Sequence, residues 1–398
     1  MNKKLLSEKE KEHSCDRRSF FKTTGLAAAG VLVSANAAPG TQKGKPAGLD
    51  LPKRTLGRTG LKVAPIGLGT IPLFQASKEL FISVVDKCQE LGMNYIDLAR
   101  GYHKGINEEY AGEALKGKRG KFVITTKSTN YTKGIVEDVE KSLKALKTDY
   151  IDIYCFHELC QEEQWQTVIS PEGAMNALKK VREQGKIRFI GISGHRSDQL
   201  TEIIKTGDID VVILPFNFVF DDALKDLCPE TRKRNVGLVA IKPFAGGFLN
   251  QHELSLRWIL EQPFDLVTAG MWQIDEVIQN ARVMHEFSPL TDSEREHLKE
   301  ERQYWYYQLC RFCYQCKECP QGVPYRSVVM MPLMLRRQGF RVALGDGGKN
   351  RYLNEMDKVF KCTNCGFCTE TCKYHLPVPE LMRNARRTYY EVVKTYGV

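Results

Sequence analysis

Short apolar segments alternate with amphipathic segments over most of this chain, and this alternation limits the possible folds more than any other feature. The apolar segments are rich in Ile and Val, which is typical of strands that are buried on both faces. We expect eight strands, at 64–69, 94–98, 122–126, 151–156, 188–193, 211–216, 237–242 and 266–270. The segments between and after them predict helices at 78–92, 107–117, 133–147, 172–185, 197–206, 222–235, 252–262 and 273–285.

Eight strand–helix units in succession have the order and the length of a (β/α)8 TIM barrel of the α/β class. A doubly wound open sheet is the alternative. However, no Gly-x-Gly-x-x-Gly follows the first strand, which disfavours a dinucleotide-binding sheet of that kind. A short hairpin that turns on Gly60 precedes the first strand. We therefore assign residues 53–290 to the barrel.

Four polar residues stand at or just beyond the ends of three consecutive predicted strands. Asp97 and Tyr102 follow the second strand, and Lys127 and His157 follow the third and the fourth. The carboxyl ends of barrel strands face one mouth, so these side chains are expected to meet there. Taken singly, each has an ordinary structural role: a cap, an exposed strand end, a loop aromatic, a core histidine. Their order at successive strand ends favours a common catalytic role.

The residue types in this group suit proton transfer to a carbonyl that receives a hydride. A tyrosine has an ordinary pKa of about 10 and is a weak acid at neutral pH. A neighbouring lysine cation favours the phenolate and lowers that pKa. A carboxylate holds the lysine in place, and a histidine can hydrogen-bond a substrate oxygen. Such a group acts as a general acid and base.

Further motifs accompany these four residues. They are Leu56-Gly-Arg-Thr-Gly-Leu61, Gly67-Leu-Gly-Thr70, Asp97-Leu-Ala-Arg-Gly-Tyr102, Asn107-Glu-Glu-Tyr-Ala-Gly-Glu-Ala-Leu115, Thr125-Thr-Lys127, Gly191-Ile-Ser-Gly-His195 and Lys242-Pro-Phe-Ala-Gly-Gly247, with Glu276 and Asn280. Together they resemble the motifs of the aldo-keto reductases. The resemblance implies a (β/α)8 barrel with the catalytic tetrad Asp97, Tyr102, Lys127 and His157.

The resemblance also implies a nicotinamide dinucleotide, NADP or NAD, along the mouth of the barrel. Ser193 would hold its carboxamide, the loop after Lys242 would lie against its pyrophosphate, and Glu276 with Asn280 would reach its adenine. The positions implied to contact it are Gly69, Thr70, Ser193, Pro243, Phe244, Ala245, Gly246, Gly270, Trp272, Glu276 and Asn280.

Four positions depart from the family pattern. Gly194 replaces an asparagine, Ile213 stands where a glutamine is expected, and Ile241 stands where an aromatic stacks on the nicotinamide. Trp272 replaces an arginine that pairs with the 2′-phosphate of NADP in many members. The guanidinium fork of an arginine fits a phosphate well. Since this arginine is missing, the sequence does not decide between NAD and NADP as the cofactor.

Eight of the thirteen cysteines lie close together near the C-terminus, in two groups of regular spacing. Each group approaches the run that binds a [4Fe–4S] cluster, in which the fourth cysteine serves the other cluster. Two zinc sites, each with four cysteine ligands, and disulfides are the alternatives, but zinc usually takes separated Cys-x-x-Cys pairs. We expect two [4Fe–4S] clusters, held by Cys310, Cys313, Cys316, Cys319, Cys362, Cys365, Cys368 and Cys372.

The segment around the cysteines is predicted to form a domain of its own. A charged helix is expected from Thr291 to Tyr307, and apolar helical residues from Val328 to Leu335 separate the two cysteine groups. The pattern therefore predicts that residues 291–398 form a C-terminal helix and a small helical ferredoxin-like iron–sulfur domain with two clusters. Some aldo-keto reductases are similar in carrying such a tail.

The N-terminus has the three parts of a twin-arginine export signal. Arg17 and Arg18 precede two aromatics and a short apolar run, and Ala35-Asn-Ala37 resembles a cleavage site. We predict a signal peptide at 1–37, a linker at 38–52, passage through the twin-arginine translocase and a periplasmic location. An uncleaved anchor, a disordered arm and a cytoplasmic enzyme are the alternatives.

The formal net charge of +10 is moderate and does not gather into a stripe, so nucleic-acid binding is not expected. A basic helix face could still dock an acidic redox partner. The sequence predicts an exported oxidoreductase that reduces a carbonyl or oxidises an alcohol, with clusters that relay electrons. The alternative is an iron–sulfur electron-transfer or interaction protein whose barrel no longer uses free NAD(P)H.

Overall fold

The computed structural model describes residues 53–338, 344 and 348–396. The predicted signal peptide and linker, residues 1–52, lie outside this part of the chain. Within the described residues, no helix is both long enough and apolar enough to cross a membrane.

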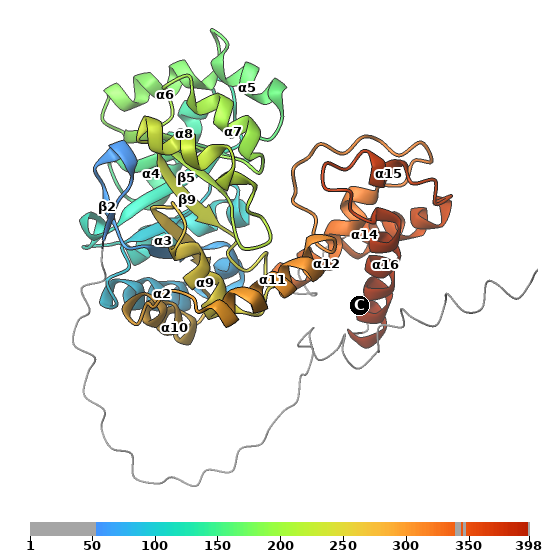
Figure 1. Ribbon diagram of the computed structural model, residues 1–398. Coiled ribbons are helices and arrows are strands. Elements are labelled where there is room, and N and C mark those ends of the chain that lie inside the picture. Colours follow the sequence, from blue (N-terminus) through green and yellow to red (C-terminus); the bar gives the residue numbers. More distant parts are fainter. Residues whose placement is uncertain (1–52, 339–343, 345–347, 397–398) are drawn as a thin grey trace, which may run out of the picture. The chain divides into compact units, whose positions relative to one another are not determined.

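Eight parallel strands close into a barrel, in the order β10-β3-β4-β5-β6-β7-β8-β9 (Figure 1). This confirms the predicted (β/α)8 barrel and excludes the open sheet. The strands are β3 (Ile66–Gly69), β4 (Tyr95–Asp97), β5 (Val123–Ser128), β6 (Ile151–Phe156), β7 (Ile187–Ser193), β8 (Val211–Pro215), β9 (Gly237–Ile241) and β10 (Leu266–Gly270). The predicted hairpin pairs β1 (Arg54–Thr55) with β2 (Lys62–Val63), and Gly60 turns it at φ 70°.

Helices follow the strands as expected. They are α2 (Lys78–Glu90), α3 (Ile106–Ala114), α4 (Ile135–Leu146), α6 (Ala174–Glu183), α7 (Ser197–Ile204), α8 (Leu227–Arg234), α9 (His252–Leu260) and α10 (Ile274–His285). One additional helix, α5 (Glu162–Ile169), was not predicted. It buries only Trp165 and Val168, so its apolar pattern is too sparse to stand out in the sequence.

Strand alternation decides which side chains point into the barrel. Side chains two residues apart in a strand share a face. Tyr95 and Ile153 belong to the small cluster inside the barrel, whereas Ile96 and Tyr154 pack outward against the helices. Asp97, two residues after Tyr95, therefore points inward.

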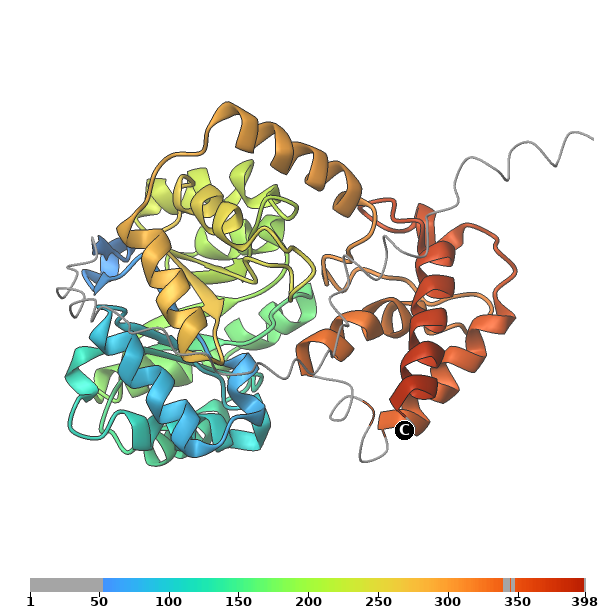
Figure 2. The same cartoon turned by 90° about the horizontal axis from the view of Figure 1, so that it is seen from below.

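The C-terminal part of the described chain is helical. It contains α11 (Asp292–Tyr306), α12 (Tyr325–Gln338), α14 (Gly348–Lys358), α15 (Phe367–Glu370) and α16 (Val378–Tyr396). The predicted helix at 291–307 corresponds to α11. A separate hydrophobic cluster includes Val328 and Met331 of α12, Met356 of α14 and Tyr389 of α16. The helices around this cluster gather at α16 in both views (Figures 1 and 2).

Candidate active site

A large cavity opens at the carboxyl ends of the barrel strands. Its volume is about 1040 Å³, enough for a dinucleotide and a small substrate. Its lining includes all four residues predicted to form the tetrad, namely Asp97, Tyr102, Lys127 and His157. The barrel thus brings together side chains that lie far apart in the sequence, as the strand-end argument predicted.

An ion pair lies at the floor of the cavity. Lys127 Nζ donates one hydrogen bond to the Asp97 carboxylate and a second, of 2.7 Å, to the carbonyl of Leu98. Only 1% of the Lys127 side chain and 7% of the Asp97 side chain are exposed. The register of the sheet fixes the pair. Asp97 on β4 stands opposite Thr125 on β5, and Lys127 follows Thr125 by two residues on β5.

Tyr102 and His157 complete the group above this pair. Their rings meet edge to face, with centroids 5.6 Å apart, and Lys127 Nζ lies 5.5 Å from the centre of the Tyr102 ring. The backbone of the turn is tied to β5, since the Arg100 amide donates to the Lys127 carbonyl at 2.9 Å. The His157 amide donates to the Ser128 carbonyl at 2.9 Å. Neighbouring strands therefore hold both rings over the lysine.

A buried polar network supports the turn that carries Tyr102. Glu108 is fully buried, and its carboxylate accepts hydrogen bonds from Arg100, at 2.5 Å, and from Thr126, at 2.6 Å. Thr70 Oγ1 donates to the Asp97 carbonyl at 2.6 Å. His103 and Lys104, directly after Tyr102, have φ values of 48° and 54°. Such left-handed backbone in non-glycine residues is often found at functional loops.

The charges of the pair keep the lysine protonated. Burial lowers the pKa of Lys127, but Asp97 and Tyr102 outweigh it and raise that pKa to about 12. Burial raises the pKa of Asp97, and the Lys127 ammonium opposes the rise. A permanent cation beside the Tyr102 ring stabilises a phenolate there.

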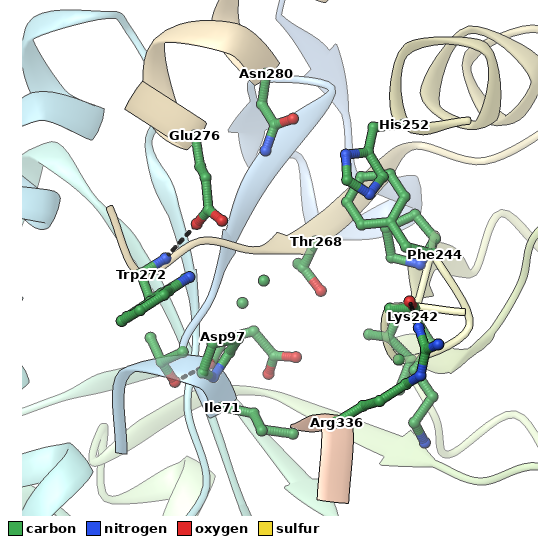
Figure 3. Close-up of a pocket in the computed structure, with 18 of the residues that line it drawn as sticks. Ile71, Asp97, Lys242, Phe244, His252, Thr268, Trp272, Glu276, Asn280 and Arg336 are labelled. Carbon is green, nitrogen blue, oxygen red and sulfur yellow. Dashed lines mark hydrogen bonds between the residues drawn. The ribbon is translucent and has the colours of Figure 1, made fainter. Parts of the chain in front are cut away.

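Ten of the eleven predicted cofactor positions line the same cavity, and several are drawn in Figure 3. Ala245 is the exception. It packs in a buried cluster with Leu249 and Leu298. Lys242 and Ala245 have φ values of 56° and 47°, so the loop that carries them has left-handed backbone at two non-glycine residues.

The structure explains two departures from the family pattern. A Cβ atom on Gly194 would approach the Leu159 carbonyl oxygen to 2.4 Å, so an asparagine cannot be accommodated there without a backbone shift. Ile213 is fully buried in the cluster inside the barrel and does not line the cavity.

Glu276 has a structural contact that the sequence did not reveal. It forms a capping box with Gln273 at the start of α10, and its carboxylate also accepts a hydrogen bond of 2.8 Å from the Trp272 amide (Figure 3). Trp272 itself is 47% exposed and lines the cavity. Asn280, one turn further along the helix, is buried and faces the same space. Of the two predicted adenine contacts, Asn280 is therefore the one without a helix-capping role.

Sequence reasoning missed several residues of the cavity wall. Two of them form a hydrogen-bonded chain: Lys242 Nζ donates to His195 Nε2 at 2.8 Å, and His195 Nδ1 donates to the Phe312 carbonyl at 3.0 Å. The His195 ring also stacks on Tyr314 at 6.1 Å. Both residues stood in quoted motifs, but nothing in the sequence indicated that they contact the first cysteine group. Leu333 and Arg336 of α12 complete the wall.

Cysteines of the two groups lie near one another. Burial raises the pKa of the Cys310 thiol to about 12, and nearby Cys316, Cys313 and Cys372 add to the rise. Burial is also the largest cause that raises the pKa of the Cys368 thiol, and the neighbouring Cys362 and Cys319 add to this rise. Cys372, the last cysteine of the second group, therefore lies near the first group, and Cys319, the last of the first group, lies near the second.

All twelve cysteines in the described part of the chain are free of disulfides. Among those residues, no three His, Cys, Asp or Glu side chains are arranged to hold a metal ion.

Comparison with known proteins decides the family. The profile of the aldo/keto reductase family matches residues 65–254. An uncharacterized oxidoreductase of Bacillus subtilis is 30% identical over 256 residues, which cover 61% of this chain and 76% of the relative. This chain belongs to the aldo/keto reductase family. It is accordingly an oxidoreductase.

Two further similarities agree with this aldo/keto reductase assignment. An L-galactose dehydrogenase of Arabidopsis thaliana is 30% identical over 216 residues, covering 50% of this chain and 67% of the relative. The holo form of an aldo-keto reductase from Bacillus halodurans superposes with a TM-score of 0.56 at 28% identity. That alignment covers 63% of this chain and 96% of the other.

Proposed function

We propose that this aldo/keto reductase transfers a hydride between a nicotinamide dinucleotide and a small carbonyl or alcohol, with Tyr102 as the general acid and base. One observation carries the proposal: the buried Asp97–Lys127 ion pair lies directly beneath the Tyr102 ring, at the floor of a cavity of about 1040 Å³. Lys127 has a structural role, because it neutralises the buried Asp97 carboxylate. It has a chemical role as well, because its cation stabilises the phenolate that remains after proton donation.

The roles of the four residues follow from their placement. The Tyr102 hydroxyl and the His157 ring bracket the place of a substrate oxygen, and His157 orients that oxygen by a hydrogen bond. The nicotinamide, when bound, supplies the hydride. As charge develops on the oxygen, Tyr102 donates its proton and becomes a phenolate beside Lys127. Asp97 keeps Lys127 charged and in place. In the oxidative direction, the Tyr102 phenolate removes the proton from an alcohol.

The cavity wall suits a dinucleotide. Ser193, at the end of β7, would hold the carboxamide, and Asn280, buried yet facing the cavity, would bind the adenine. Trp272 offers an aromatic face and no cation for a 2′-phosphate, so both NAD and NADP are candidates. The similarity to an L-galactose dehydrogenase supports an alcohol or carbonyl of a small polar molecule as the substrate class.

We further propose that the tail holds two [4Fe–4S] clusters. Cys310, Cys313, Cys316 and Cys372 would hold one, and Cys319, Cys362, Cys365 and Cys368 the other. The proximity of Cys372 to the first group and of Cys319 to the second supports this assignment, because in two-cluster ferredoxins the fourth cysteine of each group serves the other cluster. Such clusters, when bound, supply one-electron transfer.

A connection between barrel and tail supports a common redox role. The carbonyl that accepts the hydrogen bond from His195 belongs to Phe312, which lies between Cys310 and Cys313. His195 lines the cavity beside Ser193. His195 therefore joins the cavity wall to the loop of the first cysteine group. A redox partner protein would exchange electrons with the tail.

Export completes the proposal. Arg17 and Arg18 followed by an apolar run support passage through the twin-arginine translocase to the periplasm. That route carries folded proteins, which suits a chain that must acquire clusters before export.

Anaerobic purification of the full chain tests these assignments together. About eight iron and eight sulfide per chain are expected for two [4Fe–4S] clusters, together with a released dinucleotide. Zinc in place of iron would remove the relay. Iron without any bound or bindable dinucleotide would favour the electron-transfer alternative and refute the hydride mechanism. Replacing Arg17 and Arg18 with lysine should trap the chain in the cytoplasm, and unchanged export would refute the twin-arginine route.

A further inference from the structure

One cationic side chain of the tail lines the cavity of the barrel and has no carboxylate partner among the residues that the structure describes. Arg336, near the end of α12, lines the cavity, and its Nη1 donates a 2.8 Å hydrogen bond to the Gly247 carbonyl. Its guanidinium also lies 4.7 Å from the centre of the Phe248 ring. Both contacts hold the group against the loop that follows β9.

The other cations of the cavity wall are engaged differently. Lys127 pairs with Asp97, and Arg257 pairs with Glu294 at 2.7 Å. Arg336 forms no ion pair with any carboxylate in the described part of the chain, and its one hydrogen bond to Gly247 leaves most of the donors of the fork unused. Burial lowers its pKa from the ordinary arginine value, because nearby apolar groups replace water without supplying a counter-charge. A half-desolvated arginine of this kind is well suited to bind an anion.

Helix α12 packs against one glycine of this loop. A Cβ atom on Gly246 would come within 2.3 Å of Leu333 Cδ1, one helical turn before Arg336. The sequence suggested that this glycine allows the cofactor to approach the backbone. In the structure, Gly246 also lies against Leu333 of α12, the helix that brings Arg336 to the rim of the cavity.

The position of Arg336 identifies the part of a dinucleotide that it can reach. It lies on the side of the cavity that carries Lys242 and Phe244, away from Trp272 (Figure 3). That is the side of the loop after Lys242, against which the family resemblance implies that the pyrophosphate lies, and not the position of the 2′-phosphate.

We propose that Arg336 binds the pyrophosphate of the dinucleotide, so that the C-terminal tail completes the nucleotide site of the barrel. This inference rests on the proposed function, and it makes α12 part of the cofactor site. Cofactor affinity then depends on correct docking of the tail, whatever the redox state of the cysteines.

Binding measurements on the full chain test the inference without turnover. NADH and NADPH are titrated by fluorescence against wild type, Arg336→Gln, Arg336→Lys and Arg387→Gln. Arg387 is exposed on α16 and is absent from the cavity wall, so it is the matched control. Loss of a charged hydrogen bond to a phosphate should weaken the better dinucleotide about 10- to 100-fold in Arg336→Gln, with partial recovery in Arg336→Lys.

Two ligand fragments distinguish a local effect from misfolding. Inorganic pyrophosphate should compete with the dinucleotide in wild type and lose affinity in Arg336→Gln. Adenosine, which the other end of the site would hold, should bind all four proteins equally. Equal dinucleotide affinity in wild type and Arg336→Gln would overturn the inference and leave the proposed function intact. If wild type bound neither dinucleotide, both the proposed function and this inference would fall.

Discussion

Replacement of Lys127 by methionine is the perturbation that most clearly separates the chemistry of the tetrad from its stability. The Lys127 and Asp97 side chains are 1% and 7% exposed, so solvent screens the pair very little. Removing one partner of a buried pair leaves a charge without compensation and costs about 3–5 kcal/mol. The free energy of unfolding of Lys127→Met, measured in urea at about pH 8, should therefore fall by about that amount.

A second variant shows whether the cost arises from the stranded carboxylate. In Asp97→Asn with Lys127→Met, no charge is buried, and most of the lost stability should return. Turnover should stay abolished in both variants, because neither has a cation beside Tyr102. Recovery of stability without recovery of activity is the expected pattern.

The stability deficit of Lys127→Met should increase with pH. In Lys127→Met, burial raises the pKa of Asp97, and of the two lysines that oppose this rise only Lys242, whose effect is the smaller, remains. The folded-state pKa then lies above the unfolded value of about 3.9. Protonated Asp97 is tolerated, so the deficit of Lys127→Met relative to the double variant should be small near about pH 4. It should grow as the pH rises through the folded-state pKa. A single variant as stable as wild type in mildly alkaline buffer, or a deficit independent of pH, would refute the buried ion pair.

Three other predictions concern the remaining parts of the site. Tyr102→Phe removes the proton donor, so kcat/KM should fall by about 10²–10⁴, while dinucleotide affinity, measured by fluorescence, stays unchanged; equal turnover would contradict the assigned acid. Cys372→Ser and Cys365→Ser should each reduce the iron content from about eight to about four atoms per chain. The electron paramagnetic resonance spectra should show that a different cluster remains in each variant. Loss of the same cluster in both would contradict the assignment of Cys372 and Cys365 to different clusters. Trp272→Arg introduces a phosphate-binding fork, so the ratio of NADPH to NADH affinity should rise about tenfold, and an unchanged ratio would place the 2′-phosphate elsewhere.

The fold and the tetrad could be predicted because both depend on local rules. Ile- and Val-rich strands that alternate with amphipathic helices define the barrel, and the strand period of two brings Asp97 to the interior. The strand ends then place Lys127 and His157 at the same mouth. These predictions do not require knowledge of how segments far apart in the sequence pack against one another.

The rest of the site depends on such docking. Arg336 and Gly247 are 89 residues apart, and the amphipathic pattern of α12 does not say which surface it meets. The loss of the family asparagine at Gly194 is likewise explained only by the Leu159 carbonyl, which the fold brings to 2.4 Å of the missing side chain. Glu276 could be read as an adenine contact from its helix position, but its capping of α10 depends on the backbone angles at Gln273.

Isotope transfer tests the central claim most directly. Wild type and Tyr102→Phe are incubated with reduced nicotinamide dinucleotide in which deuterium replaces both hydrogens on the hydride-donating carbon of the dihydropyridine ring, together with a panel of small aldehydes and ketones. The products are analysed by mass spectrometry. The account predicts one deuterium on the former carbonyl carbon with wild type and almost none with Tyr102→Phe. Alcohol formed by wild type without deuterium would contradict direct hydride transfer in the barrel.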